Sequence, residues 1–527
     1  MKALVVLFDE ENKYQEEKVF GGKSGRELCT EFFEKAQFLP AGIDTVGVDC
    51  VKKDDVKTGS ELLAKIHQLA KEKNADFVIY SYCDLPFINL ELTKKIVQSH
   101  VEFKCEYTFA DGYPYGFAPE VIDSGAAGIL AELGRTTQAA EGEKPVCRET
   151  IWNLLKTDIN SFEVESELAE SDWRLLRLKL CCANKDDFMQ SQALYKAAVK
   201  AGVVVDGALA AGNAEEISKI ASENVSVLKT VPGFYNIQIA DGRDTKPVYE
   251  PECVFRAGKK ALTFENFATL CKKISDFSES AVLNLSFFCE PLLNADFLRI
   301  VEEVLKYEGL SVFFETSGLC VTEDFCNKLN ALVEKAAPRT NGWQKVMVAV
   351  HLDAVSAPVY AKMNGTDAAN FTKALAGCDA LCKALPGMVY PQFTRTNANE
   401  DELEAFFRYW NEKSNPSGGN CIIQKYNDFS GLLPSCKPAD LSPVERNVCW
   451  HLRRDMTILA DGSAFACPNK AAAVLAGKTD GGEGLGNVFE QPLEEIWKKT
   501  DESVLNHINK KYCEICRNCD EYYTFNF

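Results

Sequence analysis

The sequence has no apolar run long enough to cross a membrane. Its N-terminus, MKALVVLFDEENK, has an apolar stretch only from Ala3 to Phe8 before acidic residues follow, which is too short for the core of a signal peptide. The absence of both features argues against a membrane-spanning protein and against secretion through such a signal. We therefore expect a cytoplasmic protein.

Positive charge is also scarce. The 527 residues include 58 Lys and Arg against 77 Asp and Glu, which gives a formal net charge of −19. Because such a surface repels phosphates, we expect no nucleic-acid partner. A chain of this length is too long for a single hydrophobic core, so roughly two to four domains are expected.

Cysteine, in contrast, is abundant, with 21 residues. In a cytoplasmic protein the thiols stay reduced and do not predict a disulfide framework. Cys513, Cys516 and Cys519 are separated by two residues each, and Cys449 and Cys467 precede them. Closely spaced thiolates can share one metal centre, and a distant pair can complete a four-sulfur shell. The spacing alone leaves open a 4Fe–4S cluster, a structural zinc ion or unligated thiols.

A hairpin is predicted between the first two of these cysteines. Asp461 and Gly462 form the dipeptide that favours a tight turn between two strands. We expect this hairpin to bring Cys449 and Cys467 together on adjacent strands. Arg453 and Arg454 follow the first cysteine closely, and cations there would stabilise a reduced, negatively charged cluster.

The C-terminal segment resembles a SPASM domain, the auxiliary iron–sulfur module that follows many radical S-adenosylmethionine (radical-SAM) barrels. The resemblance rests on the pattern C-x12-G-x4-C from Cys449, on LGNV at 485–488, on LEEIW at 493–497 and on the closing cysteines. A full-length SPASM domain has seven cysteines for two clusters, and this segment has five, so the resemblance implies a shortened version with one 4Fe–4S cluster. Its implied ligands are Cys449, Cys467, Cys516 and Cys519, with Cys513 as the alternate.

The first 230 residues alternate strand-like and helix-like segments. Strands are expected at 2–8, 43–49 and 75–87, and helices at 25–39, 60–74 and 90–102. This order predicts a doubly wound α/β sheet, whose sites lie at the carboxyl ends of the strands. Asp84 is delivered to that edge. Helices are also expected at 172–182 and 191–203, with a loop at 208–216.

This region resembles the glycosyltransferase-A-like nucleotidyltransferases. The resemblance rests on CDLP at 83–86, GYPYG at 112–116 and KVFGGKSGREL from residue 18. It implies Mg²⁺ at Asp84, with Asp111 as a second carboxylate, and a nucleotide-sugar ligand with GYPYG lining its pocket. The glycine-rich phosphate loop is missing, however, because carboxylates and no glycine stand between Phe8 and Lys18. Such a loop does not cradle phosphates, which argues against nucleotidyl transfer.

A second strand–helix series begins at residue 234 and predicts a parallel partial barrel. The segment EPLLNADFLRIVEEVLKYEGLSVFFETSG and the later HLDA at 351–354 resemble the radical-SAM segments built on GGEP, on TNG and on a ribose-binding S-x-D loop. This resemblance implies the remnant of an S-adenosylmethionine (SAM) site, formed by Glu290, Pro291, Thr316, Ser317, Gly318 and Asp353.

The cysteines of a SAM-cleaving cluster are missing from this barrel. Arg243, Pro247 and Glu250 stand where the resemblance places the C-x3-C-x2-C motif, and Phe288 and Cys289 replace the two glycines of GGEP. Arginine and proline cannot ligate iron, so we expect a degenerate barrel that does not cleave SAM. Convergence of the single thiols Cys253, Cys289 and Cys320 on a rebuilt site is the less favoured alternative.

Taken together, these features resemble the spirochete SPASM-domain proteins. The resemblance implies three domains, at 1–230 (nucleotidyltransferase-like), 231–445 (radical-SAM-like) and 446–527 (SPASM). Three functions follow as hypotheses: an iron–sulfur binding or electron-transfer protein with a redox partner, a nucleotide-sugar enzyme, and a radical-SAM enzyme acting on a peptide or envelope precursor. No catalytic residue is assigned.

Overall fold

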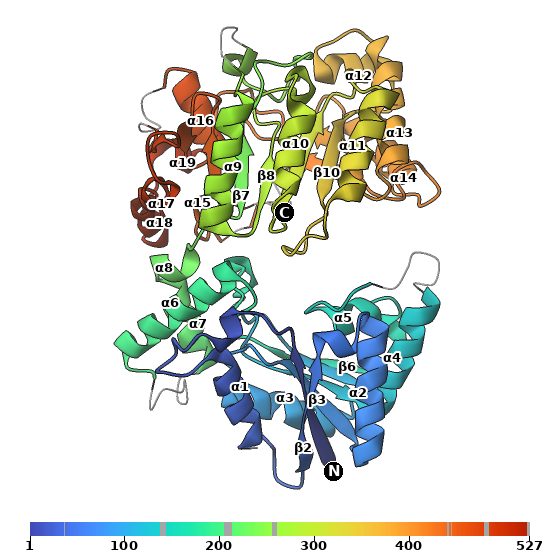
Figure 1. Ribbon diagram of the computed structural model, residues 1–527, viewed down its shortest axis with the longest axis vertical. Helices are drawn as coiled ribbons and strands as arrows, with labels where there is room; N and C mark the ends of the chain where they lie inside the picture. The colour runs from blue at the N-terminus through green and yellow to red at the C-terminus, as the bar shows by residue number, and fades with distance from the viewer. Residues whose placement is uncertain are drawn as a thin grey trace. The chain divides into compact units, whose positions relative to one another are not determined.

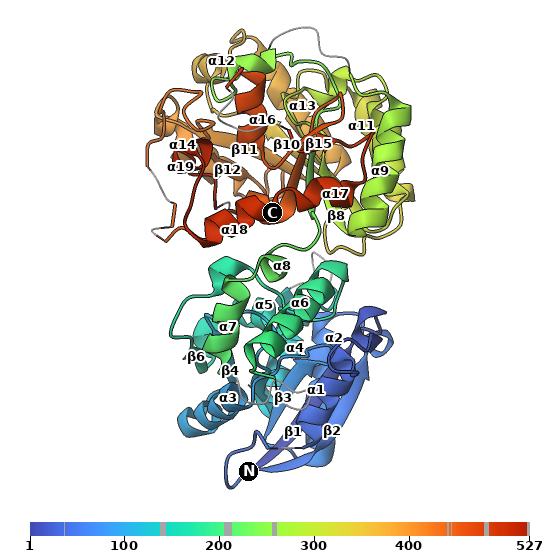
Figure 2. The same cartoon turned by 90° about the vertical axis from the view of Figure 1, so that its left-hand side faces the viewer.

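The computed structural model describes residues 1–35, 37–137, 144–204, 213–255, 261–439, 442–443, 445–478 and 484–523. Its internal contacts divide the chain into two compact units, Met1–Thr230 and Val231–Phe527. Each unit is built around its own β-sheet (Figures 1 and 2). The residues from 446 onward, expected as a separate domain, contribute three strands to the sheet of the second unit.

The N-terminal unit contains a six-stranded sheet in the order β2-β1-β3-β5-β4-β6. The β1, β2 and β3 strands are parallel, as predicted, and β5 runs antiparallel to both of its neighbours. The sheet is therefore mixed. Its strands are β1 (Lys2–Asp9), β2 (Asp44–Lys52), β3 (Phe77–Tyr82), β4 (Tyr107–Asp111), β5 (Glu120–Asp123) and β6 (Val164–Leu168).

The helices of this unit follow the predicted strand–helix alternation. The second helix begins with a capping box, in which Thr58 and Glu61 satisfy each other's backbone amides, so its N-terminus is fixed by the local sequence. Helices are α1 (Gly25–Glu34), α2 (Gly59–Lys73), α3 (Leu90–Phe103), α4 (Ser124–Thr137), α5 (Thr150–Leu155), α6 (Lys185–Ala201), α7 (Ala214–Ser222) and α8 (Val225–Leu228).

Two expectations for the end of this unit have different outcomes. The prediction of a helix at 172–182 is wrong. Within this range the structure has only a short 3₁₀ turn, Arg174–Leu176, after which Arg177 adopts a left-handed backbone with φ +49°. A left-handed residue stops helix propagation. The loop expected at 208–216 lies partly outside the described residues, and α7 begins within its last part.

The C-terminal unit contains a nine-stranded sheet in the order β12-β11-β10-β9-β8-β7-β13-β14-β15. The strands from β12 through β7 to β13 are all parallel, so the predicted parallel strand–helix architecture is confirmed. They are β7 (Phe234–Ile237), β8 (Ala281–Asn284), β9 (Leu310–Thr316), β10 (Val346–His351), β11 (Val389–Arg395), β12 (Ile422–Lys425), β13 (Asp455–Ile458), β14 (Ser463–Phe465) and β15 (Gly486–Asn487).

Helices α9, α10, α11 and α13 pack on these strands through one large apolar core (Figure 1). The core includes Val348 and Val350 on β10 and extends to Trp497 in the tail, so the C-terminal segment shares it. The helices are α9 (Phe264–Ser278), α10 (Phe297–Leu305), α11 (Glu323–Lys335), α12 (Ala357–Asn364), α13 (Asn370–Ala384), α14 (Leu403–Trp410), α15 (Trp450–Arg454), α16 (Pro468–Leu475), α17 (Leu493–Lys498), α18 (Asp501–Ile508) and α19 (Glu514–Arg517).

The hairpin predicted around the Asp461-Gly462 turn is present. Strands β13 and β14 pair antiparallel, and Gly462 adopts φ +87°, where a Cβ would meet the ring of Phe489 at 2.4 Å. The expectation that Cys449 and Cys467 lie on these two strands is wrong. Both residues are helix N-caps: α15 separates Cys449 from β13, whereas Cys467 lies just beyond the end of β14 and begins α16.

Candidate functional site

The tail cysteines occupy the N-terminal ends of three short helices. Cys449 precedes α15, Cys467 precedes α16, and Cys513 precedes α19, which contains Cys516 and is followed by Cys519. The helices α15, α16 and α19 all belong to the C-terminal part of the second unit, drawn in orange to red in Figures 1 and 2. Amides at a helix N-terminus point outward and stabilise negative charge, which suits thiolates.

Several N–H groups donate to these sulfurs. The backbone amide of Lys470 donates to Cys467 Sγ over 3.4 Å, and the backbone amide of Glu521 donates to Cys519 Sγ over 3.3 Å. The side-chain amide of Asn469 also donates to Cys519 Sγ, over 3.4 Å. Hydrogen bonds of this kind stabilise cluster-bound thiolates and tune the cluster's reduction potential, so the donor set fits an iron–sulfur cluster.

The thiols also influence one another electrostatically. Burial raises the pKa of Cys449, and the neighbouring thiols Cys519 and Cys467 raise it further. The pKa of Cys516 is raised by its hydrogen bond to Cys513, by burial, and by the charges of Cys467 and Cys449. The structure thus brings the predicted ligands from three chain segments into one neighbourhood.

Cys513 differs from the other tail cysteines because it is exposed. Its hydrogen bond to Cys516 lowers the pKa of Cys513 to about 5. Across the described part of the chain, no group of three or more His, Cys, Asp or Glu side chains is arranged to hold a metal ion. A four-iron cluster keeps its thiolates farther apart than a single tetrahedral ion keeps its ligands, so this result bears on a single-ion site and not on a cluster.

The two arginines expected beside the first cysteine lie on α15. The guanidinium of Arg454 donates to Asp455 Oδ1 over 2.7 Å and lies 4.9 Å from the ring centroid of Phe234. Arg453 is 5% exposed and lies over the ring of Trp450 at 5.1 Å. Their positive charge is therefore held close to the helix that Cys449 caps.

In the barrel, an ion pair occupies the positions expected for the cysteines of a SAM-cleaving cluster. Arg243 and Glu250 form a salt bridge in which the two side chains are only 6% and 8% exposed. The carbonyl of Pro247 accepts the Glu250 amide over 3.1 Å, so the segment forms a closed turn. The residues at these three positions do not fit an iron–sulfur cluster, because none offers a thiolate and two of them are paired with each other as ions of opposite charge.

The three other thiols considered as a rebuilt site have separate hydrogen-bond partners. Cys253 donates to the carbonyl of Ala472 over 3.6 Å, and Cys320 donates to Asp244 Oδ2 over 3.6 Å. Cys289 is fully buried and donates weakly to a backbone carbonyl at 3.8 Å. These contacts are those of packed thiols, which behave as small hydrophobic side chains.

Four residues of the predicted SAM-site remnant lie together. Glu290 is fully buried and accepts hydrogen bonds from Thr316 Oγ1 and from the backbone amide of Ser317, both at 2.9 Å. The Gly318 amide donates to Thr316 Oγ1 over 3.1 Å, and Gly318 has φ +77°, beside the backbone of α13. Burial is the main reason that the pKa of Glu290 is raised to about 7. Pro291 begins the 3₁₀ turn Pro291–Leu293 directly after this carboxyl.

The sixth predicted residue, Asp353, lies in a different hydrogen-bond chain. The hydroxyl of Tyr249 donates to Asp353 Oδ2 over 2.7 Å and lies 2.7 Å from His351 Nδ1. His351 Nε2 in turn stands 3.6 Å from a carboxylate oxygen of Glu315. Burial opposes a charged imidazole, but the carboxylates of Glu315 and Asp353 outweigh it and raise the pKa of His351. The chain is thus a line of coupled proton-binding groups.

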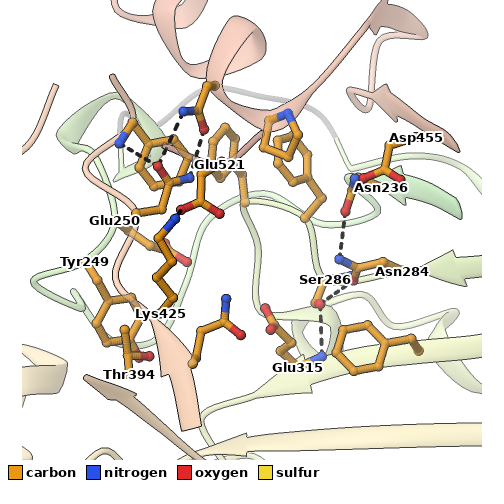
Figure 3. A pocket seen from close by; sticks show the side chains of 18 of the residues that line it. Asn236, Tyr249, Glu250, Asn284, Ser286, Glu315, Thr394, Lys425, Asp455 and Glu521 are labelled. Carbon is orange, nitrogen blue, oxygen red and sulfur yellow. Dashed lines mark hydrogen bonds and ion pairs between the residues drawn. The ribbon is translucent and has the colours of Figure 1, made fainter. Parts of the chain in front are cut away.

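A cavity of about 240 Å³ opens beside this chain, near the carboxyl ends of the parallel strands of the C-terminal unit (Figure 3). On one side, Asn284 donates to Asn236 over 3.0 Å and accepts from Ser286 Oγ over 2.6 Å. On the other side, Lys425 lies 3.2 Å from Glu521, so the C-terminal segment supplies part of the wall. Charged groups of both signs line the cavity, which therefore suits a polar ligand without a large net charge.

Sequence reasoning named Arg243, Glu250 and His351, which line this cavity, but it did not predict the cavity and gave no role to Asn236, Asn284 or Glu315. Asn236, Asn284, Glu315 and His351 lie on β7, β8, β9 and β10, each within a run that reads as buried strand. The available signal was a polar side chain near the carboxyl end of every strand, which is where barrel sites form.

Phe288, one of the two residues that stand where the sequence resemblance predicted glycine, has a left-handed backbone with φ +51°. A bulky residue rarely adopts this conformation. Its ring stacks on Phe287 at 4.0 Å and packs in an apolar cluster with Ala471 and Ala472 of the tail. The side chain therefore fills space between the barrel and α16, which compensates for the backbone strain.

In the N-terminal unit, Asp84 is engaged by an arginine. Arg148 donates to both oxygens of Asp84, over 3.0 and 2.7 Å, and also to Glu10 over 2.8 Å. Its guanidinium lies 4.2 Å from the ring centroid of Tyr82. A bidentate guanidinium neutralises the carboxylate and blocks the oxygens that Mg²⁺ requires.

The second predicted carboxylate has a partner of its own. Asp111 lies 3.1 Å from Arg174, so each of the two acids is paired with a different arginine. The GYPYG segment lines a cavity of about 190 Å³ together with Arg148.

Comparison with known proteins agrees with the cysteine pattern of the tail. The model of the SPASM family, described as an iron-sulfur cluster-binding domain, matches residues 449–520. The class of the C-terminal segment is therefore that of SPASM domains.

Two similar proteins come from a spirochete. A protein of Treponema pallidum (strain Nichols), described as uncharacterized, is 36% identical over 389 residues, which cover 72% of this chain and 99% of that protein. A second uncharacterized protein of the same strain is 38% identical over 74 residues, or 14% of this chain and 33% of the other. This chain belongs to the same family of spirochete SPASM-domain proteins.

Solved structures give weaker likenesses. BtrN in complex with AdoMet and 2-DOIA is 13% identical, with 55% of this chain and 94% of that chain covered and a TM-score of 0.35. SuiB of Streptococcus suis bound to the precursor peptide SuiA is 12% identical, with 63% of this chain and 84% of that chain covered and a TM-score of 0.42.

No helix in the described ranges has the length and apolar character that a bilayer crossing requires.

Proposed function

We propose that this chain is an iron–sulfur protein that holds one 4Fe–4S cluster on its tail cysteines and whose degenerate barrel binds a ligand without cleaving SAM. The observation that carries this proposal is the buried Arg243–Glu250 ion pair. A SAM-cleaving cluster needs three thiolates and one iron left open for SAM. An arginine paired with a glutamate provides neither a ligand nor space for the cluster.

The proposed ligands are Cys449, Cys467, Cys516 and Cys519. Their support is the position of Cys449 and Cys467 at helix N-termini, the amide donors to Cys467 and Cys519, and the deep burial of Cys449. Cys513 is the alternate ligand, and its exposure makes it the least protected of the five. Zinc in the same shell is the alternative occupant.

The polar cavity of the barrel supports the binding role. The Tyr249–His351–Glu315 chain and the Asn236–Asn284 pair offer donors and acceptors on opposite walls. A small polar ligand or the end of a peptide is the proposed occupant, and a redox protein is the proposed partner if the cluster carries electrons.

Incubation of the anaerobically reconstituted and reduced full-length protein with SAM tests this proposal. We expect SAM to remain intact, with no 5′-deoxyadenosine detected by liquid chromatography and mass spectrometry. Turnover of SAM to 5′-deoxyadenosine would overturn the proposal and favour a radical-SAM enzyme that modifies a peptide or envelope precursor.

A second candidate function is nucleotide-sugar nucleotidyl transfer in the N-terminal unit. The cavity beside the GYPYG segment favours a small ligand there, whereas the Asp84–Arg148 pair disfavours Mg²⁺. Calorimetric titration with nucleoside triphosphates and Mg²⁺ tests whether this unit binds a nucleotide together with the metal ion. Mg²⁺-dependent binding of a nucleoside triphosphate that Asp84→Asn abolishes would support this function. If no such binding is measured, the N-terminal unit is not a nucleotidyltransferase.

A further inference from the structure

The cavity of about 190 Å³ in the N-terminal unit has an aromatic lining around one carboxylate. Strand register explains the arrangement. Tyr80 on β3 pairs directly with Glu120 on β5, and the pairing of Thr108 with Val121 sets Phe109 on β4 next to Glu120 on its other side. Because opposed residues of antiparallel strands project from the same face, the carboxylate stands between aromatic side chains of two strands.

The segment between β4 and β5 adds to this aromatic lining. Tyr113, Tyr115 and Phe117 all border the cavity, as does Tyr82 from the end of β3. Gly116 permits the close approach of this segment, since it has φ +107° and a Cβ there would lie 2.2 Å from the carbonyl oxygen of Leu180. Aromatic side chains therefore line the cavity on several sides, and the Arg148 guanidinium already lies over the rings of Tyr82 and Tyr115, at 4.2 and 5.5 Å from their centroids.

Among the described residues, no cation forms an ion pair with Glu120. Its Oε2 atom is buried and, within the described residues, no hydrogen-bond partner contacts it. The hydroxyls of Tyr80 and Tyr82, which are 3% and 2% exposed, are also buried without a hydrogen bond from the described chain. A buried carboxylate oxygen without a hydrogen bond is costly, so it indicates a ligand that completes the site.

The arginine that borders the cavity does not neutralise this acid. The guanidinium of Arg148 donates to Asp84 and to Glu10, so its charge is already offset. Burial raises the pKa of Glu120 to about 8, partly offset by a hydrogen bond from Tyr107. The site thus carries one uncompensated negative charge when Glu120 is ionised.

We infer that this cavity binds a small organic cation of the methylated ammonium class, with Glu120 opposite its charge and aromatic rings around its methyl groups. Ring faces attract cations, and they do so most effectively when water is excluded. A hard metal ion would need several oxygen ligands, whereas one carboxylate among rings suits a soft, weakly hydrated cation. This inference does not depend on the iron–sulfur proposal.

Titration of the full-length protein with choline, followed by calorimetry, tests the inference. The matched neutral probe is 3,3-dimethylbutan-1-ol, which has the same shape without the charge. We expect choline to bind at least about tenfold more tightly than the neutral probe, because only the cation gains from the carboxylate and from cation–π contacts.

The variant Glu120→Gln removes the charge and keeps the shape of the side chain. We expect it to weaken choline binding at least about tenfold and to leave the thermal melting temperature unchanged or higher, because the amide carries no charge and its oxygen can still accept the hydrogen bond from Tyr107. The control Glu132→Gln changes a glutamate whose side chain is 67% exposed, and it should bind choline like the unaltered protein.

Choline affinity should also rise between pH 6 and pH 9, because the cation binds the ionised carboxyl and displaces its proton below the raised pKa. The titratable groups facing Glu120 are Tyr80 on β3, Tyr107 on β4 and Glu149 before α5. Equal affinity for the two probes, unchanged binding by Glu120→Gln, or no binding at millimolar choline would each overturn the inference.

Discussion

Arg243 and Glu250 illustrate how two side chains decide what the barrel can hold. Each is nearly inaccessible to water, and each offsets the charge of the other. A buried ion pair contributes little net stability compared with an apolar pair, but losing one partner leaves the other charge without compensation. The folded unit therefore tolerates these two buried charges only while both residues are present.

A double-mutant cycle tests this reading. Arg243→Leu should lower the free energy of unfolding by about 3–5 kcal/mol because it strands the buried Glu250 carboxylate. Arg243→Leu/Glu250→Leu should recover most of that loss, as measured by urea unfolding with tryptophan fluorescence. Arg408→Leu is the matched control, since the Arg408–Glu404 pair is 77% and 75% exposed and its loss should cost no more than about 1 kcal/mol. A single variant as stable as the parent would contradict the account.

Glu290 provides a pH-dependent prediction. Because burial raises the pKa of Glu290 from 4.5 to about 7, the folded state retains a proton that the unfolded chain releases. The associated stability is complete below pH 4.5, is lost as the pH rises to 7, and amounts to about 3 kcal/mol.

The side chain of the variant Glu290→Gln cannot titrate, so its free energy of unfolding should lack the pH-dependent contribution of Glu290. The free energy of unfolding of the variant, relative to the parent, should therefore improve by up to about 3 kcal/mol between pH 5 and pH 8. Glu334→Gln, at an exposed position of α11, serves as the control and should show no such change. Parallel pH profiles for the parent and Glu290→Gln would contradict the assignment of a raised pKa to this carboxyl.

At the scale of elements, the tail cysteines are held by short helices rather than by strands. The DG turn predicted the hairpin β13–β14 correctly, because glycine at φ +87° is required there. The positions of Cys449 and Cys467 could not be predicted from the turn. Their placement depends on α15 and α16, whose lengths of five and eight residues are too short for a periodic signal.

Substitution of single cysteines tests the ligand assignment. Cys467→Ala and Cys519→Ala should lose the visible absorbance of the cluster, whereas Cys513→Ala should retain it because this thiol is exposed and outside the proposed shell. Cys378→Ala, in the buried face of α13, is the control for a thiol that only packs. If Cys513→Ala loses the cluster and Cys519→Ala retains it, Cys513 is the ligand and Cys519 is not.

Limited proteolysis of the same variants separates a structural cluster from a purely redox one. If the cluster cross-links the tail, Cys467→Ala should lose protection after about residue 445 and keep the preceding part intact, since thiolate ligation contributes folding energy. The tail shares the barrel core through Ile496 and Trp497, which opposes complete release. An unchanged digestion pattern would mean that this packing alone holds the tail.

At the scale of the molecule, the sequence predicted the α/β class and the parallel order of the second unit because its strands are continuous apolar runs. It did not predict the antiparallel β5, whose four residues carry no distinct pattern, or the barrel cavity, whose polar groups come from four separate strands. Pairings such as Asp84 with Arg148, 64 residues apart, arise from tertiary packing and leave no local signal.

The central claim is that the chain holds one 4Fe–4S cluster in its tail and none in its barrel. Iron and acid-labile sulfide analysis of the anaerobically purified full-length protein, combined with Mössbauer spectroscopy, tests it most directly. We predict about four iron and four sulfide per chain, in one cubane environment that Cys467→Ala abolishes. About eight iron per chain, or stoichiometric zinc without sulfide, would contradict the account.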